Sequence, residues 1–219
     1  MEAVHVVVTT SPNYQGVYKY FETSVKGVPN ITVHDHMLDL SVYDTGNFHS
    51  DGWYYACRQK LINNISFIKE NPNIEYVVLS DADIQYFRPE LLVTLVQEAR
   101  KLDLDYYGMR EDQQSTYNTG FIIAKNNIKI HDLLQSTIDK LAVSRPHLAD
   151  QSIINNIIFN DADKNIKHAF IPSKYYTWGD GTPGPDTIFH HAVNIGRIDM
   201  KIEQLERVLN RYLIASSSQ

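Results

Sequence analysis

The sequence predicts an α/β protein with a mainly parallel central sheet flanked by helices. Short apolar runs alternate along the chain with segments of helical period, which is the pattern of β-α-β units. The first run, residues 3–9, hardly alternates between apolar and polar side chains, as in a strand buried on both faces. No Pro/Gly/Ser-rich linker divides the 219 residues. Since a domain usually takes about 150 residues, we expect one domain.

The first half of the chain contains clear strand and helix patterns. The elements expected there are a strand at 3–9, a helix at 16–26, a strand at 31–35, a helix beginning at 51, a strand at 74–79 and a helix at 88–100. Gly27 closes the first of these helices, and Asp51 is interpreted as the N-cap of the second. Pro89 is compatible with the first turn of the third helix.

The second half of the chain continues the alternation. The elements expected there are strands at 104–109 and 120–124, helices at 129–143 and 149–159, a strand at 167–171, a loop at 178–186, a strand at 187–193 and an amphipathic helix at 201–214. The loop, WGDGTPGPD, is a candidate lid over a ligand, although such loops often serve only as connections.

Composition excludes some classes of function. The formal net charge is −6 and the pI is near 5.8, so the chain lacks the basic character of a general binder of nucleic acids or anionic membranes. Its single cysteine, Cys57, excludes an internal disulfide and fits a reducing compartment. No signal peptide is recognisable, and no apolar stretch approaches the ~18 residues that span a bilayer. We therefore expect a soluble, cytoplasmic protein without membrane insertion.

The most informative stretch is YVVLSDADIQYFRP, where an apolar run leads into Asp81 and Asp83. Residues two apart in an extended chain project to the same side, so both carboxylates can face one point. Two carboxylates that close repel each other unless a cation lies between them, and oxygen ligands suit Mn²⁺ or Mg²⁺. The alternative is a solvated turn, which is our interpretation of the same tripeptide at 161–163, after a helix. The position behind a buried strand favours a metal site at Asp81 and Asp83.

Two later motifs supply further candidate residues. In STYNTGFIIAK, Asn118 and Gly120 directly precede an apolar strand, where glycine permits close approach of a ligand and asparagine offers a donor and an acceptor. A plain turn into an edge strand is about equally consistent with these residues. Asp150 and Gln151 begin an apolar helix, where they either cap it or hydrogen-bond sugar hydroxyls.

A pair of histidines lies in the predicted strand at 187–193. His190 and His191 are adjacent, so they face opposite sides of that strand, and only one of them readily reaches a shared site. A neutral imidazole suits a borderline cation such as Mn²⁺, whereas the other histidine is expected to be an ordinary core residue. Lys201, beyond Gly196, can meet a diphosphate as a point charge.

Taken together, these residues resemble a known family. Their order is an apolar strand with Asp-x-Asp, then Asn-x-Gly-Phe, Asp-Gln at a helix start, and a late His-Ala…Gly…Lys. This order is similar to that of the GT-A glycosyltransferases, in particular the nucleotide-diphospho-sugar transferases related to retaining galactosyl-, xylosyl- and glucosyltransferases. The similarity runs from Val4 to about Lys201. The short chain also resembles glycosyltransferase domains encoded by large algal viruses.

The resemblance implies a single GT-A (Rossmann-like) domain over residues 1–219. It would consist of a nucleotide-binding half at about 1–85, an acceptor-binding half at about 86–200 and a C-terminal helix at 201–214. The implied activity is metal-dependent transfer of a hexosyl-type sugar from a UDP-sugar to a hydroxyl acceptor such as a glycan, with retention of the anomeric configuration.

The resemblance also implies roles for individual residues. Asp83 would be a direct ligand of Mn²⁺ or Mg²⁺, Asp81 would contact the metal or the ribose, and His191 would be the third protein ligand. His191 is preferred to His190 because Lys201 follows it by ten residues, although the spacing from glycine to lysine is one residue longer than in the family. The residues implied to face the nucleoside, the transferred sugar or the acceptor are Thr9, Thr10, Tyr14, Arg58, Asn118, Gly120, Asp150, Gln151 and Lys201.

Three other functions are weighed against this one. Phosphatases of the haloacid dehalogenase type also carry Asp-x-Asp after an apolar strand, but they usually place it near the start of the domain. A sugar-1-phosphate nucleotidylyltransferase would need a Gly-rich, Arg-containing loop after the first strand, which is missing here. A catalytically silent module that binds a sugar nucleotide or carbohydrate is the non-enzymatic alternative.

Overall fold

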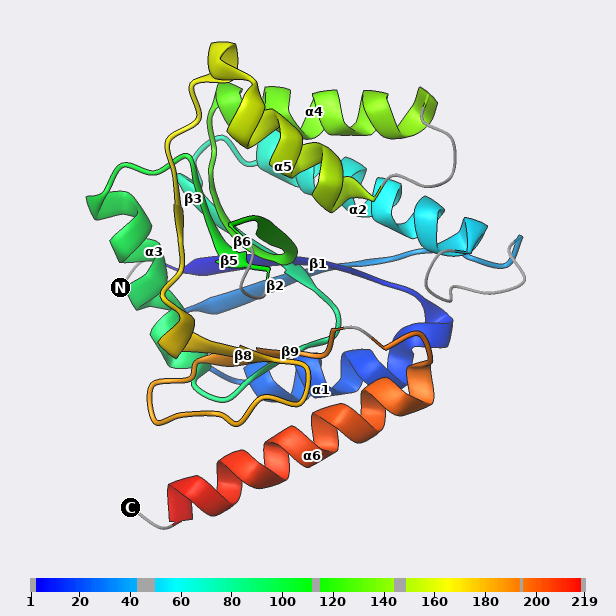
Figure 1. Ribbon diagram of the computed structural model, residues 1–219, viewed down its shortest axis with the longest axis vertical. Coiled ribbons are helices and arrows are strands. Elements are labelled where there is room, and N and C mark those ends of the chain that lie inside the picture. The colour runs from blue at the N-terminus through cyan, green and yellow to red at the C-terminus, as the bar shows by residue number, and fades with distance from the viewer. Residues whose placement is uncertain (1–2, 43–49, 112–114, 144–148, 194, 218–219) are drawn as a thin grey trace.

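The computed structural model describes residues 3–42, 50–111, 115–143, 149–193 and 195–217. Within these residues the strands form a six-stranded and a three-stranded sheet (Figure 1). The larger sheet has the order β2-β1-β3-β6-β5-β7, with β2 at Ile31–Met37, β1 at Val4–Thr10, β3 at Tyr76–Asp81, β6 at Tyr117–Lys125, β5 at Tyr106–Arg110 and β7 at His168–Phe170. The smaller sheet has the order β4-β9-β8, with β4 at Ile84–Tyr86, β9 at Phe189–His191 and β8 at Tyr176–Trp178.

The larger sheet is mainly parallel, as the sequence predicts. β1 runs parallel to β2 and β3, and β7 runs parallel to β5. β6 is antiparallel to both of its neighbours, β3 and β5, so it alone opposes the common direction among the described strands of this sheet. The carboxyl ends of β1 and β3 therefore lie at one edge, and the start of β6 returns to the same edge. In open α/β sheets such an edge is where ligands bind.

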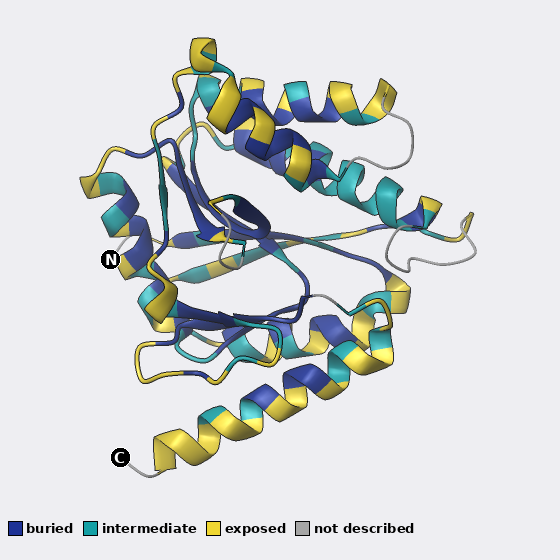
Figure 2. Ribbon diagram, viewed as in Figure 1, coloured by how far each residue is buried: buried dark blue, intermediate teal, exposed yellow. Residues whose placement is uncertain are grey.

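Helices cover both faces of the larger sheet. One face packs against α1 (Gln15–Val25) and α3 (Leu92–Lys101), and the other against α2 (Asp51–Glu70), α4 (Ile128–Val143) and α5 (Asp150–Asn160). In β1, Val6 and Val8 join the first cluster while Val7 joins the second, as the alternation of strand side chains requires. Figure 2 shows the resulting buried strands between partly exposed helices. α6 (Ile198–Ser217) packs against α1.

Several boundaries differ from those expected. The N-cap of α2 is Ser50, whose hydroxyl accepts the Trp53 N–H at 3.2 Å, so Asp51 is the first helical residue and not the cap. The helix expected at 88–100 begins with a 3-10 turn at Pro89–Leu91 and becomes α-helical only in α3. β6 begins earlier than expected, which places Asn118 and Gly120 inside a strand and not before it.

The three-stranded sheet is the main departure from the expected order of elements. β4 and β8 were not predicted, and each has only three residues, too few to show an alternating pattern. Trp178 belongs to β8, so the loop expected at 178–186 starts one residue later, at Gly179 with a φ of +58°. Among the described helices, none carries an apolar stretch of the length that crossing a membrane requires.

Candidate active site

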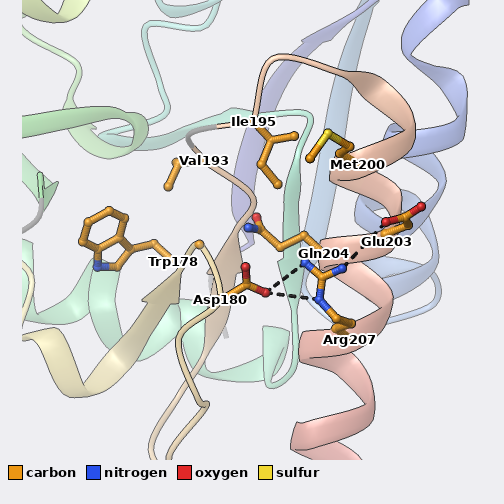
Figure 3. A pocket seen from close by; sticks show the side chains of 9 residues that line it. Trp178, Asp180, Val193, Ile195, Met200, Glu203, Gln204 and Arg207 are labelled. Carbon is orange, nitrogen blue, oxygen red and sulfur yellow. Dashed lines mark hydrogen bonds and ion pairs between the residues drawn. The ribbon is translucent and has the colours of Figure 1, made fainter.

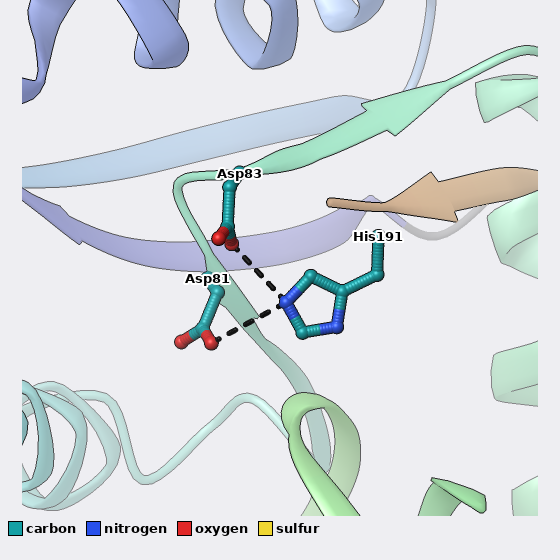
Figure 4. A group of neighbouring side chains, drawn as sticks. All are labelled: Asp81, Asp83 and His191. Atoms are coloured by element: carbon teal, nitrogen blue, oxygen red, sulfur yellow. Dashed lines mark ion pairs between the residues drawn. The ribbon is translucent and has the colours of Figure 1, made fainter. Parts of the chain in front are cut away.

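The two aspartates lie where β3 passes into β4, beside the end of β9. Asp81 is the last residue of β3, and Asp83 precedes β4 and is 5% exposed. β4 pairs with β9 in the register Ile84↔His191, which brings the His191 ring beside both carboxylates. The His191 Nε2 lies 3.2 Å from an Asp83 carboxylate oxygen and 3.7 Å from an Asp81 oxygen (Figure 4). The candidate ligand atoms of the three residues lie within 4.8 Å of one another.

The neighbouring His190 faces the other way. Its Nε2 lies 2.8 Å from the Gly179 carbonyl oxygen, and its side chain is fully buried. Burial lowers the pKa of His190 to about 4, so this ring is neutral at physiological pH. Period two along β9 therefore separates a core histidine from one that meets the aspartates, and the structure brings His191 to the acidic pair.

Gly120 makes room for this cluster. A β-carbon at this position would lie 2.2 Å from the His191 Cε1, and 2.9 Å from both the Asn118 Oδ1 and the Asp81 Oδ2. No real β-carbon tolerates such contacts with a packed ring, so any larger residue would displace the candidate ligands. The Gly120 N–H also donates to the Asn118 Oδ1 at 2.8 Å, which fixes the orientation of that amide.

Two lysines balance the charge of the acidic side chains. The Lys201 ammonium contacts the Asp83 carboxylate and donates to the Ala192 carbonyl at 2.8 Å. Burial alone would raise the pKa of Asp83, but the Lys201 ammonium and the His191 ring outweigh it and lower the pKa below its ordinary value. Asp83 is therefore ionised at neutral pH, as a metal ligand must be.

Lys60 is the second of these lysines, and sequence reasoning missed it. Its ammonium lies 3.0 Å from Asp81 and 3.0 Å from Asp150, so it bridges the end of β3 and the start of α5. Burial alone would lower the pKa of Lys60, but the carboxylates of Asp150 and Asp81 raise it well above its ordinary value. A signal existed in the sequence, because Lys60 lies about one turn after Cys57 in the predicted helix, and residues three apart share one helix face.

The Asp81–Asp83–His191 group forms one wall of the site, and the start of the chain contributes a second wall. The Tyr14 hydroxyl donates to the Asp83 Oδ2 at 3.1 Å, and burial followed by the charge of Asp83 raises the pKa of Tyr14. The Thr9 Oγ1 accepts from the Asn63 amide at 3.2 Å. The Thr10 hydroxyl is buried and has no hydrogen-bond partner within the described ranges, so a ligand can supply one.

The third wall comes from β6 and the start of α5. Asp150 does not cap its helix, because the N-cap is Ala149, and its buried carboxylate instead accepts from the Thr119 hydroxyl at 3.4 Å. The Gln151 amide accepts the Thr119 N–H at 3.3 Å and donates to Glu111 at 3.0 Å. Glu111, which also accepts from the Asn118 amide, was not anticipated from the sequence. This network holds several polar side chains in fixed orientations around one space.

The three walls enclose a pocket of about 570 Å³. Eleven of the twelve site residues expected from the sequence line it. They come from β1, the turn that follows it, β3, the turn between β3 and β4, β6, α5, β9 and α6. Arg58 is the exception: it lies on α2 but is not among the described residues that line the pocket, and the cation that α2 supplies is Lys60. Trp53 and Cys57 also line it, from the same helix.

The fold and this pocket define the class of protein, a GT-A glycosyltransferase, and comparisons with known proteins agree. The model of the nucleotide-diphospho-sugar transferase family matches residues 25–203, so the chain belongs to that family. This membership makes it a glycosyltransferase of the nucleotide-sugar type. A comparison with curated protein sequences finds no match.

Several solved structures share the fold. A glycosyltransferase involved in the glycosylation of the major capsid of PBCV-1 aligns with a TM-score of 0.65 and 11% identity, covering 93% of this chain and 98% of the other. Mouse xyloside xylosyltransferase 1 aligns with a TM-score of 0.51 and 10% identity, covering 88% and 98%. The glycosyltransferase GlyE of Streptococcus pneumoniae TIGR4 aligns with a TM-score of 0.56 and 12% identity, covering 99% of this chain but 64% of GlyE.

Proposed function

We propose that this protein transfers a hexosyl-type sugar from a UDP-sugar to a hydroxyl group of a glycan, with retention of configuration and with a divalent cation. The observation that carries the proposal is the Asp81–Asp83–His191 group inside the pocket of the nucleotide-sugar transferase fold. The family match and the fold favour a transferase over the phosphatase alternative, which neither of them supports.

The side chains present fit a divalent cation. Two carboxylates and one imidazole form a donor set that suits Mn²⁺, and Mg²⁺ with somewhat less preference because of the nitrogen ligand. Gly120 has only a hydrogen where another residue has its β-carbon, so the candidate ligand side chains can converge at this position. When bound, the cation would neutralise charge on the diphosphate of the donor as a Lewis acid.

The remaining side chains would hold the donor and guide the transfer. Thr9, Thr10 and Tyr14 would line the nucleoside part, and Lys201 would move from Asp83 to the diphosphate as a point charge. Arg58 does not line the pocket among the described residues, so its contact with the sugar nucleotide would require α2 to reorient. These contacts would place the anomeric carbon near the third wall.

Asp150, Gln151 and Asn118 would face the transferred sugar and the acceptor. In the transfer, the bond from the anomeric carbon to the diphosphate oxygen breaks, the acceptor oxygen bonds to that carbon, and the acceptor proton leaves to the departing UDP. Positive charge builds up on the sugar ring in between. Asp150 carries a buried negative charge on this side of the pocket, so its carboxylate would stabilise that charge.

A panel of donors tests the proposal. UDP-galactose, UDP-glucose, UDP-N-acetylglucosamine and UDP-xylose are incubated with the protein and Mn²⁺, and UDP release is measured with and without EDTA. We expect one hexose donor to be turned over in the presence of the metal only. Proton NMR spectra recorded at the first time points, before mutarotation, should show the released sugar as the anomer of the donor. Turnover that survives EDTA, or release of phosphate from simple monoesters without any UDP release, would contradict the proposal.

A further inference from the structure

A second pocket lies on the far side of the segment that carries β9 into α6. Its volume is about 470 Å³, and its walls come from the end of β8, the residues after β9 and one face of α6 (Figure 3). Val193 and Ile195 line both this pocket and the first one, around Asp81 and Asp83, which we call the donor pocket. The two cavities are therefore immediate neighbours. None of the site residues discussed above lines the second pocket, and the roles proposed so far leave it without a ligand.

Gln204 is the polar group that marks this pocket as a binding site. Its side chain is 3% exposed, and its Oε1 has no hydrogen-bond partner within the described part of the chain. The Asp180 carboxylate lies nearby, and its pKa is lowered by the Arg207 guanidinium and, to a lesser degree, by the Gln204 amide. Figure 3 shows the amide directed toward the side where Trp178 and Val193 lie. An unsatisfied buried acceptor costs free energy, so it is a group for which a ligand donor can compensate.

The charges of the pocket select against an anionic ligand. Arg207 is the one cation among the described residues that line it, and its guanidinium already pairs with Asp180 at 3.0 Å. Glu203 adds a second carboxylate 3.9 Å from the same guanidinium, so the lining carries one more negative than positive charge. A phosphate or a nucleotide would find no unpaired cation among the described lining residues, whereas a neutral ligand with hydroxyl groups could donate to Gln204 and to both carboxylates.

The other walls suit the apolar face of a sugar ring. Trp178 presents a half-buried indole, and Val193, Ile195 and Met200 add further apolar side chains to the lining. A pocket with one aromatic wall and a few fixed polar groups binds small ligands whose faces differ in polarity. A pyranose is such a ligand, since its C–H groups lie on its faces and its hydroxyls at its rim.

We propose that this second pocket binds a neutral sugar unit of the acceptor glycan, held between Trp178 and Gln204. The assignment of this sugar to the acceptor rests on the proposed transferase function. It is motivated by position, since the second pocket adjoins the donor pocket through Val193 and Ile195. A glycan anchored here extends toward the donor, and the anchored unit fixes which hydroxyl is presented to the reaction.

The two tryptophans of the chain allow each pocket to be observed separately. Trp53 lines the donor pocket and Trp178 lines the second one. In a ¹⁵N-labelled sample each indole N–H gives its own NMR signal, assigned with Trp53→Phe and Trp178→Phe. The probes are methyl glycosides of glucose, galactose, mannose, xylose and N-acetylglucosamine. Each is titrated to about 50 mM, because a single sugar unit binds weakly.

We expect at least one glycoside to shift the Trp178 signal saturably while the Trp53 signal stays in place. Gln204→Met keeps the volume of the side chain but removes the amide, and it should weaken this binding about fivefold or more. Gln135→Met makes the same change at an exposed position of α4 and should leave glycoside binding unaltered. A Trp178 signal that no glycoside moves, a shift that survives Gln204→Met, or a shift of Trp53 alone would overturn the proposal.

The same spectra separate this inference from the proposed function. UDP with Mg²⁺, which is diamagnetic and leaves NMR signals sharp, should move the Trp53 signal in the wild type and in Gln204→Met, which also shows that the variant is folded. A Trp53 signal that ignores UDP and Mg²⁺ counts against the transferase function, whereas a saturable glycoside shift at Trp178 still supports the sugar site.

Discussion

The tripeptide Asp-Ala-Asp occurs twice in this chain, and its two copies have opposite surroundings. At 81–83 it continues the buried strand β3 into β4, and both carboxylates meet His191. At 161–163 it follows α5 and forms a 3-10 turn that ends at Asn165 in the left-handed conformation. Asp163 is exposed there, whereas Asp83 is 5% exposed.

The difference teaches that position in the fold, and not the residues themselves, makes a candidate metal site. At the edge of a parallel sheet, neighbouring strands and helices deliver further polar groups to the same point. Lys60, Lys201 and His191 all come from other elements. Lys60 contacts Asp81, Lys201 contacts Asp83, and His191 contacts both. At a surface turn nothing comparable converges, and among the described residues the group with metal-ligating potential is the first pair with His191.

The largest expected difference between the two copies is in catalysis. Asp83→Asn removes a charged candidate ligand, so we expect turnover of the UDP-sugar to fall on the order of 10³-fold. Asp163→Asn makes the same change in the second copy and should leave turnover within about twofold. UDP release at saturating Mn²⁺ measures both. Equal losses in the two variants would erase the proposed distinction.

A second difference concerns the lysine beside each pair. Lys60→Met leaves the buried Asp150 and the partly buried Asp81 without their shared cation, and we expect the free energy of unfolding to fall by about 3 kcal/mol without metal. Lys164→Met, next to the exposed pair, should change it by no more than about 0.5 kcal/mol. Urea denaturation in EDTA compares them. If Lys60→Met were as mild as Lys164→Met, the bridge would not be holding the site together.

The smallest of the three effects comes from a single methyl group. Gly120→Ala places a β-carbon against His191 and Asp81, so we expect Mn²⁺-dependent UDP affinity to fall about tenfold, with a stability loss of about 1–3 kcal/mol. Gly184→Ala is the matched control, because its β-carbon would meet only the Thr187 hydroxyl at 3.9 Å. Calorimetric titration and thermal unfolding are the measurements. Wild-type affinity in Gly120→Ala would show that the cluster is not packed against this position.

The sequence predicted the position of the acidic pair in the fold, because a strong local pattern precedes it. The apolar run before Asp81 identifies a buried strand, and such a strand ends at the ligand-binding edge of an α/β sheet. Alternation along β9 predicted that only one of His190 and His191 reaches the site, whereas the preference for His191 came from the resemblance to the family. The apolar run and the alternation are properties of neighbouring residues, so one sequence contains them. The extent of the domain, 1–219 with its two halves, stays a prediction.

The sequence did not predict what depends on contacts between distant segments. β4 and β8 exist because β9 pairs with both, and three residues each leave no periodic signal. The rotation of α2 against β3 and α5 directs Lys60, and not Arg58, toward Asp81 and Asp150. An error of one or two residues in the predicted helix boundary is enough to hide this rotation. Glu111 acquires its place from Asn118 and Gln151, which lie on other elements.

One measurement tests the central claim most directly, that the pair at 81–83 holds a divalent cation that binds the sugar nucleotide. UDP is titrated calorimetrically into the wild type, Asp83→Ala and Asp163→Ala, each with Mn²⁺ and with EDTA. We expect the wild type to bind UDP with Mn²⁺ but not with EDTA. This binding should be retained in Asp163→Ala and lost in Asp83→Ala. Binding of UDP that is equal in EDTA, or that Asp83→Ala leaves intact, would contradict it.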